Sequence, residues 1–525
     1  WGPHKDDVVY TTDDSFTPDM AVPLGGTASM DEWIDKWGAN GRMITREDAE
    51  ALGISTNGPV NMFDAYDYFK TGVSWKTHAS VTSGDDNSSY YLSASTNQNA
   101  SVIPNDSWDK SSFRLTASQQ LADNVTLEGS VNLTDTKGVR IQRGSNISGV
   151  MLGLLRTPPS WDNSYGYEFA DGTQRTFQGG SGYDNPYWTS NKILYQDHNT
   201  RAISYGELSW DINDWMSLTY RLGFDYWSEF VHYHFAKNSN ASSDGYKEKW
   251  NRYNRELNSD LILNISRDLT SDLGIDFTGG HHAYERWYET ATAQANGLIE
   301  PEFYDVSNTT AQDADEYTLK LRRGGIFGDL TFSYQDMLFL GGTGRFDWST
   351  TMPQDQNPFF YPSVNLGFVF TELPFMDNIS DFLSFGKLRA SYAVTASDAG
   401  AYNTVTTFSS GEIWSGWTQY TSFPFLGYTG YDRSFEIGNQ NLKPEQQVTQ
   451  EVGLDLRFFD GSLRLDVAYF QNRNEDLLMG VPIAPSSGFS SAFLNAGTME
   501  TTGIEVLLNV TPVQTQDFTW DFSVN

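Results

Sequence analysis

Strands of alternating apolar and polar residues recur along this chain of 525 residues, and the gaps between them alternate in length. In residues 215–227, Leu218, Tyr220 and Leu222 alternate with Thr219 and Arg221. Successive side chains of a strand point to opposite faces, so this segment has one apolar face and one polar face. An antiparallel soluble sheet with one wet face gives the same alternation. The lengths of the gaps distinguish the two folds.

The short gaps contain Asp, Asn and Gly, which adopt positive φ and bond to their own backbone in tight turns. They are Gly84-Asp85-Asp86, Ala122-Asp123-Asn124, Asn213-Asp214, Gln335-Asp336 and Asp460-Gly461. The long connections between them are 138–198, 229–250, 291–315 and 398–446. Loops this long argue against a compact soluble domain, whereas a membrane barrel has short periplasmic turns and long outer loops. The sequence therefore predicts an all-β fold, a transmembrane antiparallel β-barrel with about 16 strands present.

The composition agrees with a barrel and limits the partners. No stretch reaches the run of about 18 apolar residues that a transmembrane helix needs. Aromatic residues make up 15% of the chain, enough to form the aromatic girdles that barrels carry at both membrane interfaces. The absence of cysteine excludes disulfides and Cys-ligated metals. A formal net charge of −33 argues against nucleic acid as a partner, since phosphate binding requires a basic surface.

Short segments in a fixed order extend over nearly the whole chain and carry a resemblance to one family. They are Trp1–Pro3, Phe69–Gly72, Ile103–Asn105, Asp184–Trp188, Asn441–Glu445, Glu451–Phe459, Gly488–Ser491, Leu494–Gly497 and Thr502–Glu505. Through these segments the chain resembles the SusC/RagA family of TonB-linked (TonB-dependent) outer-membrane transporters.

The resemblance implies a barrel of about 22 strands whose lumen is filled by an N-terminal plug. On that pattern we expect residues 1–72 to form the first extracellular loop and residues 73–525 to supply strands 2 to 17 with their loops. Val73–Ser83 would be the second strand and Phe518–Asn525 the seventeenth. The plug and the remaining strands would lie outside this chain, which would be a partial receptor barrel of the bacterial outer membrane.

The resemblance also implies a function and a set of partners. Family members import oligosaccharides or peptides into the periplasm with energy delivered through TonB to the plug. A SusD-like surface lipoprotein acts as a lid, and two transporter–lipoprotein pairs can form a dimer within outer-membrane lipid and lipopolysaccharide. Two alternatives remain open: a receptor for a metal chelate or small cofactor that works without a lid, and a scaffold or passenger of a larger outer-membrane assembly.

Aromatic side chains in two long loops are the candidate residues for contact with the substrate or the lid. They are Trp161, Tyr165, Tyr167, Tyr187 and Trp188 in one loop and Trp414, Trp417, Tyr420, Tyr428 and Tyr431 in the other. Flat rings with a polar tip suit stacking on sugars or packing against a protein. The same residues also suit aromatic cores on which the loops fold, and this alternative stays open.

Further features of the sequence bear on metal binding, catalysis and local structure. His232 and His234 share one face of an extended segment, and we expect them to pack near the outer rim because no third metal ligand is evident. Asp313, Asp315 and Glu316 offer oxygens for loop-bound Ca²⁺ but lack the EF-hand pattern. No nucleophile with a base and no acid/base pair stands out, so the sequence predicts neither an enzyme nor a cofactor. A short helical turn is predicted at Met151–Leu155.

Overall fold

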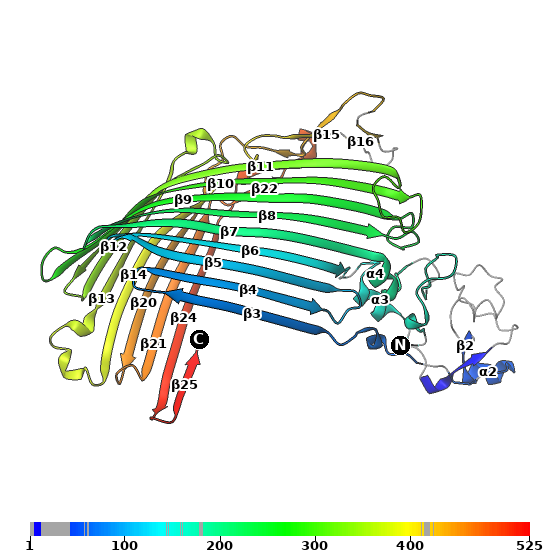
Figure 1. Ribbon diagram of the computed structural model, residues 1–525, viewed down its shortest axis with the longest axis horizontal. Helices are drawn as coiled ribbons and strands as arrows, with labels where there is room; N and C mark the ends of the chain where they lie inside the picture. Colours follow the sequence, from blue (N-terminus) through cyan, green and yellow to red (C-terminus); the bar gives the residue numbers. More distant parts are fainter. Residues whose placement is uncertain are drawn as a thin grey trace.

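The computed structural model describes residues 5–11, 42–56, 58–59, 62–142, 144, 146–157, 159, 161–177, 182–410, 412–413, 421–423 and 425–525. Within these residues, 16 strands form one antiparallel sheet in which each strand pairs with its neighbour in the chain (Figure 1). The order runs from β3 at one edge to β25 at the other, and the ribbon shows the sheet curving strongly along this order. This is the predicted fold class.

The strands of the large sheet are β3 (Val73–Gly84), β4 (Ser88–Ala100), β5 (Ser107–Ala122), β6 (Val125–Ile141), β7 (Ile193–Asn213), β8 (Met216–Phe235), β9 (Tyr246–Asp268), β10 (Leu273–Leu298), β11 (Thr309–Tyr334), β12 (Leu338–Ser349), β13 (Phe359–Val369), β14 (Leu383–Ser397), β20 (Glu445–Phe458), β21 (Leu463–Glu475), β24 (Met499–Gln514) and β25 (Thr519–Val524).

Smaller elements occupy the connections and the first residues. The short strands are β1 (Val8–Thr11), β2 (Arg42–Thr45), β15 (Phe408–Ser410), β16 (Glu412–Ile413), β17 (Thr421–Ser422), β18 (Tyr431–Arg433), β19 (Glu436–Ile437), β22 (Leu478–Pro482) and β23 (Ser491–Asn495). The α-helices are α2 (Arg46–Leu52), α3 (Val150–Arg156) and α4 (Pro186–Lys192). The 3₁₀ turns are η1 (Lys5–Asp7), η2 (Ala65–Tyr68), η3 (Asn163–Tyr165), η4 (Gln354–Gln356), η5 (Phe370–Glu372), η6 (Asp377–Ile379) and η7 (Pro485–Ser487).

None of the helices in the described ranges is long and apolar enough to cross a membrane. The helix predicted at Met151–Leu155 is α3, which spans Val150–Arg156. It packs with η2, so that Tyr68, Val150 and Leu154 form part of a buried cluster above the ends of β6 and β7.

The tight turns predicted from Asp, Asn and Gly all lie at one end of the sheet. Gln335 and Asp336 adopt φ of 51° and 52° between β11 and β12, and Asp460 and Gly461 adopt 54° and 88° between β20 and β21. The connection 370–382 is longer than the others at this end and contains η5 and η6. The long loops lie at the opposite end, which is therefore the outer end of the barrel.

The apolar face of the strands is exposed, whereas the polar face is internally bonded. Leu222 on β8 is 41% exposed, and Leu133 on β6 is 45% exposed. On the opposite face, Arg221 donates to Glu207 at 2.6 Å. A soluble sheet would bury the apolar face against other elements. This chain presents it outward, as a barrel does to lipid, and pairs its charges inside.

Two of the predicted long connections are wrong in extent. Residues 229–250 and 291–315 were expected to be loops, but β8 continues to Phe235 and β9 begins at Tyr246. Likewise β10 continues to Leu298 and β11 begins at Thr309. Backbone pairing persists beyond the apolar band because neighbouring strands still supply hydrogen-bond partners after the side chains become polar.

Candidate ligand-binding wall

Strands β7 to β11 extend well past the membrane. β9 has 23 residues and β10 and β11 have 26 each, whereas a tilted strand crosses the hydrocarbon with about 9–11. The outer parts of these strands carry aromatic residues at positions that continue the polar, lumen-facing side of the sheet. We call these residues the inner wall: Tyr195, Trp227, Tyr233, Trp250, Tyr284, Tyr288 and Tyr317.

The rings of the inner wall contact one another across strands. The centroid of Tyr195 lies 5.7 Å from that of Trp250. Tyr288 lies 6.1 Å from Trp227 and 6.3 Å from Tyr317. Aromatic pairs of this kind fix each other's orientation. The inner wall therefore presents ring faces at set positions from the outer membrane interface upward.

Guanidinium groups lie among these rings and are paired with acids or amides. Arg252 lies 4.6 Å from the ring centroid of Trp250 and forms a 3.3 Å ion pair with Glu229. Arg286 donates from Nε to Oδ1 of Asn254 at 2.7 Å. Rings beside paired charges suit a ligand that stacks and offers hydroxyl or amide groups. Because the cations are already paired, the wall does not favour a strongly charged ligand.

Two of the predicted loop aromatics enclose an arginine. The guanidinium carbon of Arg175 lies 4.4 Å from the ring of Trp161 and 5.0 Å from that of Tyr165. Its Nη1 donates to the carbonyl oxygens of Asp162 at 2.7 Å and Gly166 at 3.0 Å. Burial lowers the pKa of Arg175 to about 10. Tyr165 remains 64% exposed, so its outer face is available to a partner.

The other three predicted residues of this loop pack within it. Trp188 is 1% exposed, and its Nε1 donates to Oγ of Ser239 at 2.9 Å. Tyr167 meets Trp188 edge to face at 6.4 Å, and Tyr187 meets Tyr68 in the same way at 4.9 Å. Trp188 belongs to the core of the loop, which is the alternative that the sequence left open.

The second predicted group lies partly beyond what the structure describes. Trp414, Trp417 and Tyr420 lie outside the described residues. Tyr428 and Tyr431 are 77% and 73% exposed. They lie in the 398–444 connection, which bears β15 to β19 on the outer side of the barrel (Figure 1).

The cavity beside the first loop is too small for a sugar or a peptide. It has a volume of about 70 Å³ and is lined by Phe63, Tyr68, Trp161, Tyr187 and nine other residues. A space of this size holds only a few water molecules. The more extended surface for a ligand is the inner wall.

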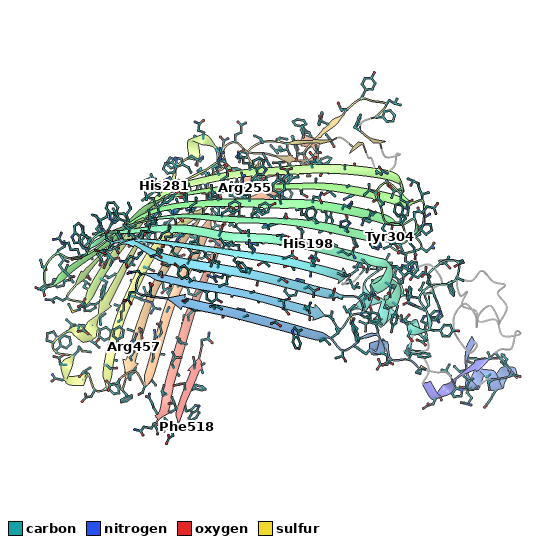
Figure 2. All side chains as sticks on the ribbon, in the orientation of Figure 1. His198, Arg255, His281, Tyr304, Arg457 and Phe518 are labelled. Atoms are coloured by element: carbon teal, nitrogen blue, oxygen red, sulfur yellow. The ribbon has the colours of Figure 1, made fainter. Side chains whose placement is uncertain are left out.

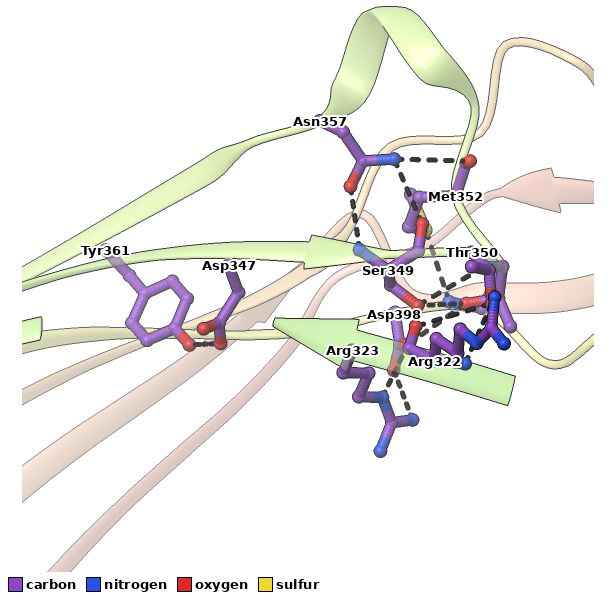
Figure 3. Close-up of polar contacts among 11 residues, drawn as sticks. Arg322, Arg323, Asp347, Ser349, Thr350, Met352, Asn357, Tyr361 and Asp398 are labelled. Atoms are coloured by element: carbon purple, nitrogen blue, oxygen red, sulfur yellow. Dashed lines mark hydrogen bonds and ion pairs between the residues drawn. The ribbon is translucent and has the colours of Figure 1, made fainter. Parts of the chain in front are cut away.

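An acidic hub anchors the second loop to the inner wall (Figure 3). Asp398, the first residue after β14, accepts bonds from Nε and Nη2 of Arg323 at 2.8 and 2.7 Å. It also accepts from Oγ of Ser349 at 2.5 Å and Oγ1 of Thr351 at 3.0 Å. Burial raises the pKa of Asp398, but the bonds from Arg323 and Ser349 outweigh burial and hold the pKa below its usual value. Arg323 in turn lies 6.0 Å from the ring of Tyr284 in the inner wall.

The histidines and acids considered as metal ligands are placed otherwise. His234 stacks on Tyr304 with centroids 3.8 Å apart, which is the predicted aromatic packing near the rim. Asp313 and Asp315 lie on β11 rather than in a loop, with Gln294 and Thr292 of β10 as their strand partners. Glu316 follows them on the same strand. Across the described ranges, no group of three or more His, Asp or Glu side chains is arranged to hold a metal ion.

Sequence reasoning missed Tyr195, Tyr233 and Trp250 of the inner wall because it assigned residues 138–198 and 229–250 to loops. The signal was present in the alternation, since Trp227, Glu229, Val231 and Tyr233 lie on one side of a continued strand. In these outer segments, the lumen-facing positions carry large aromatic and charged residues instead of small polar ones. The segments therefore have the composition of a loop, which obscured the alternation of the strand.

The curved sheet, its exposed apolar band and its bonded inner face define this chain as the wall of an outer-membrane β-barrel receptor. The chain belongs to the family described as TonB dependent receptor-like, beta-barrel, whose model matches residues 156–525. The resemblance to the SusC/RagA family is confirmed, because the chain matches SusC in sequence and RagAB in structure.

Three similar proteins show the extent of the match. The TonB-dependent receptor SusC of Bacteroides thetaiotaomicron is 26% identical, over 87% of this chain and 47% of the relative. The TonB-dependent receptor P39 of Formosa agariphila is 22% identical, over 91% of this chain and 44% of the relative. The RagAB peptide transporter has a TM-score of 0.75 at 17% identity, over 98% of this chain and 59% of that chain. The chain thus spans about half the length of the curated relatives it matches.

Proposed function

We propose that this chain supplies the barrel wall of a transporter that imports oligosaccharides or peptides into the periplasm with energy delivered through TonB. The inner wall is the observation that supports this most. Its rings and paired charges extend from the outer membrane interface upward and suit a flat or extended ligand rich in hydrogen-bonding groups. The match to a peptide transporter and to SusC supports the same direction.

The partner that fits the outer surface is a SusD-like lipoprotein acting as a lid. Exposed rings on the two long loops, at Tyr165, Tyr428 and Tyr431, offer the large contact area at low entropy cost that protein interfaces use. TonB would act on the plug that family members carry before the barrel. Two transporter–lipoprotein pairs would form the complete assembly.

The first experiment is isolation of the full-length protein from native outer membrane in mild detergent, followed by peptide mass spectrometry. A stoichiometric SusD-like lipoprotein together with plug peptides supports energised import with a lid. The absence of both components would contradict the transporter and favour a scaffold in a larger assembly. A plug without a lipoprotein, together with a bound metal chelate, would favour a chelate receptor.

The ligand class is tested by calorimetric binding of oligosaccharide and peptide libraries to the same preparation. Trp250→Ala removes an inner-wall ring and should weaken binding of the active library by about tenfold, the usual cost of losing one aromatic anchor. Trp348→Ala is the matched control, because Trp348 lies on the outward face of β12 and is 40% exposed. Equal effects of the two substitutions would contradict a ligand site on the inner wall.

A further inference from the structure

A cluster of basic residues lies on the outward face of β9, β10 and β11, the face that meets lipid. Cross-strand register places Arg255 beside Trp287 and Trp287 beside Lys320. Glu285 pairs with Arg322 in the same way. Figure 2 labels Arg255 on these strands. We call these five residues the outward cluster.

The height of the outward cluster follows from the strand ends. Arg255, Glu285 and Arg322 each lie about 12 residues from the tight-turn ends of their strands. A tilted strand needs about 9–11 residues to cross the hydrocarbon. Below the cluster, on the same face, Leu261 and Ile326 are 42% and 53% exposed. The cluster therefore lies just above the apolar band, at the level of the outer-leaflet headgroups.

One carboxylate is shared by three cations. Glu285 lies 2.6 Å from Nε of Arg322, 3.4 Å from Nη2 of Arg255 and 3.9 Å from Nζ of Lys320. Arg255 and Lys320 also lie 5.0 and 5.2 Å from the ring of Trp287. Three positive charges against one negative charge leave an excess of two. The rings and stems beneath the cations hold them at the surface.

The cations project outward beyond the acid that they share. The side chains of Arg322, Lys320 and Arg255 are 60%, 45% and 42% exposed, whereas Glu285 is 25% exposed. Glu289, the next acid on this face of β10, accepts from the hydroxyl of Tyr253. Counting Glu289 still leaves one net positive charge, although the whole chain carries −33. A local excess of this kind attracts a multivalent anion.

We propose that the outward cluster binds the phosphate groups of lipopolysaccharide in the outer leaflet. Two guanidinium groups and an ammonium suit phosphate oxygens, because guanidinium bonds phosphate in a bidentate manner. The exposed aliphatic residues below would contact the acyl chains of the same lipid, and Trp287 lies at the interface where tryptophan is enriched. The site concerns the surrounding membrane and is independent of the transported ligand.

The tight-turn end of the same sheet supplies a matched comparison. There Arg267 lies 5.0 Å from the ring of Trp215. Arg267 is on the outward face of β9, at the opposite membrane interface from the outward cluster. Arg267 is thus a single cation on a tryptophan ring, whereas the outward cluster has three cations. Arg267→Gln therefore controls for the loss of an outward arginine.

The test uses the full-length protein, expressed in its own outer membrane and purified in mild detergent. Lipid A phosphate per mole of protein is measured by mass spectrometry for wild type and for the triple variant Arg255→Gln, Lys320→Gln, Arg322→Gln. Each basic residue at an anionic surface contributes about fivefold in affinity. The triple variant should therefore retain at least about tenfold less lipopolysaccharide, whereas Arg267→Gln should retain the wild-type amount.

Correct assembly is checked by heat-modifiable migration on gels. If the triple variant fails to assemble, the single variants Arg255→Gln and Arg322→Gln are used, and each should lower retention about fivefold. Arg255→Lys with Arg322→Lys keeps the charge and should retain most of the lipid. Unchanged retention in the glutamine variants overturns the proposal. An equal loss in Arg267→Gln, or charge-dependent retention of phospholipid in place of lipopolysaccharide, also overturns it.

Discussion

The two long outer loops differ in how far they bury their aromatic residues. In the 142–192 loop, α3 and α4 pack together, and Trp188 is 1% exposed against Ile193 and Phe235. In the described part of the 398–444 loop, Tyr428 and Tyr431 are more than 70% exposed and the strands are two or three residues long. Similar compositions thus give one loop with a core of its own and one that presents its rings to the outside.

The two loops also differ in the hydrogen bonds that their buried carboxylates accept. In the first loop, Asp184 accepts from Nε2 of Gln174 at 2.7 Å, Oγ of Ser148 at 2.5 Å and the backbone N–H of Asn240 at 2.7 Å. These bonds join the loop to the β8–β9 connection. In the second loop, the corresponding anchor is the Asp398 hub at the base. A buried core fixes the first loop along its length, whereas the hub and a buried cluster of Met352, Ala399 and Leu442 hold the second loop at its base.

Trp188→Ala should have the largest effect on this comparison. The substitution empties a fully buried site and removes the bond to Ser239, which costs about 3–5 kcal/mol of local stability. The 142–192 loop should become sensitive to limited proteolysis, while cleavage in the 398–444 loop stays at the wild-type rate. If the mutant loop resists proteolysis as well as the wild-type loop does, Trp188 does not form its core.

Asp398→Ala should release the base of the second loop. The change removes the acceptor for Arg323, Ser349 and Thr351 and costs about 2 kcal/mol, since Arg323 is half exposed and its charge is partly screened. Proteolysis should now increase in 398–444 and not in 142–192. Arg345→Gln removes an ion pair with Asp347 on the same inner face and serves as the control. Increased cleavage in both variants would contradict an anchor at Asp398.

Asp184 gives the first loop a pH dependence opposite in sign to the one that the lowered pKa of Asp398 gives the second loop. Burial raises the pKa of Asp184 above its ordinary 3.8, so the folded loop binds the proton more tightly than the unfolded loop. The contribution of Asp184 to the stability of the loop should therefore be greatest below pH 3.8 and should fall as the pH rises through the raised pKa. Asp184→Asn should abolish this slope and change stability by no more than about 1 kcal/mol near neutral pH. Urea unfolding monitored by tryptophan fluorescence at several pH values measures the slope, and a slope that persists in the mutant contradicts this assignment.

Tyr428→Ala and Tyr431→Ala should have the smallest effect on stability. Both rings are exposed, so each substitution should change the free energy of unfolding by less than about 0.5 kcal/mol. If these rings contact the lid, the same variants should lose affinity for the co-purified lipoprotein by about tenfold. Tyr334→Ala, on the outward face of β11, is the control for loss of an exposed tyrosine. Unchanged lipoprotein affinity in both loop variants would remove these rings from the interface.

The sequence by itself determined the barrel, the turn end and the outer end. Alternation in segments such as 215–227 and turn residues such as Asp336 and Asp460 act locally, so each strand and turn is readable without its neighbours. The apolar face also had to meet lipid, because the long loops left no compact soluble fold. Trp161 and Tyr165 were predicted from their type and position as contacts for a substrate or lid, and that role stays a prediction.

Only the tertiary structure decided which aromatic residues remain available. Trp188 and Tyr165 look alike in the sequence, but packing buries the first and exposes the second. The inner wall depends on strands that continue past the membrane because their neighbours continue too, and this is a property of pairing rather than of one segment. The outward cluster brings together residues from three strands that are up to 67 positions apart, from Arg255 to Arg322, and only the register places them around one carboxylate.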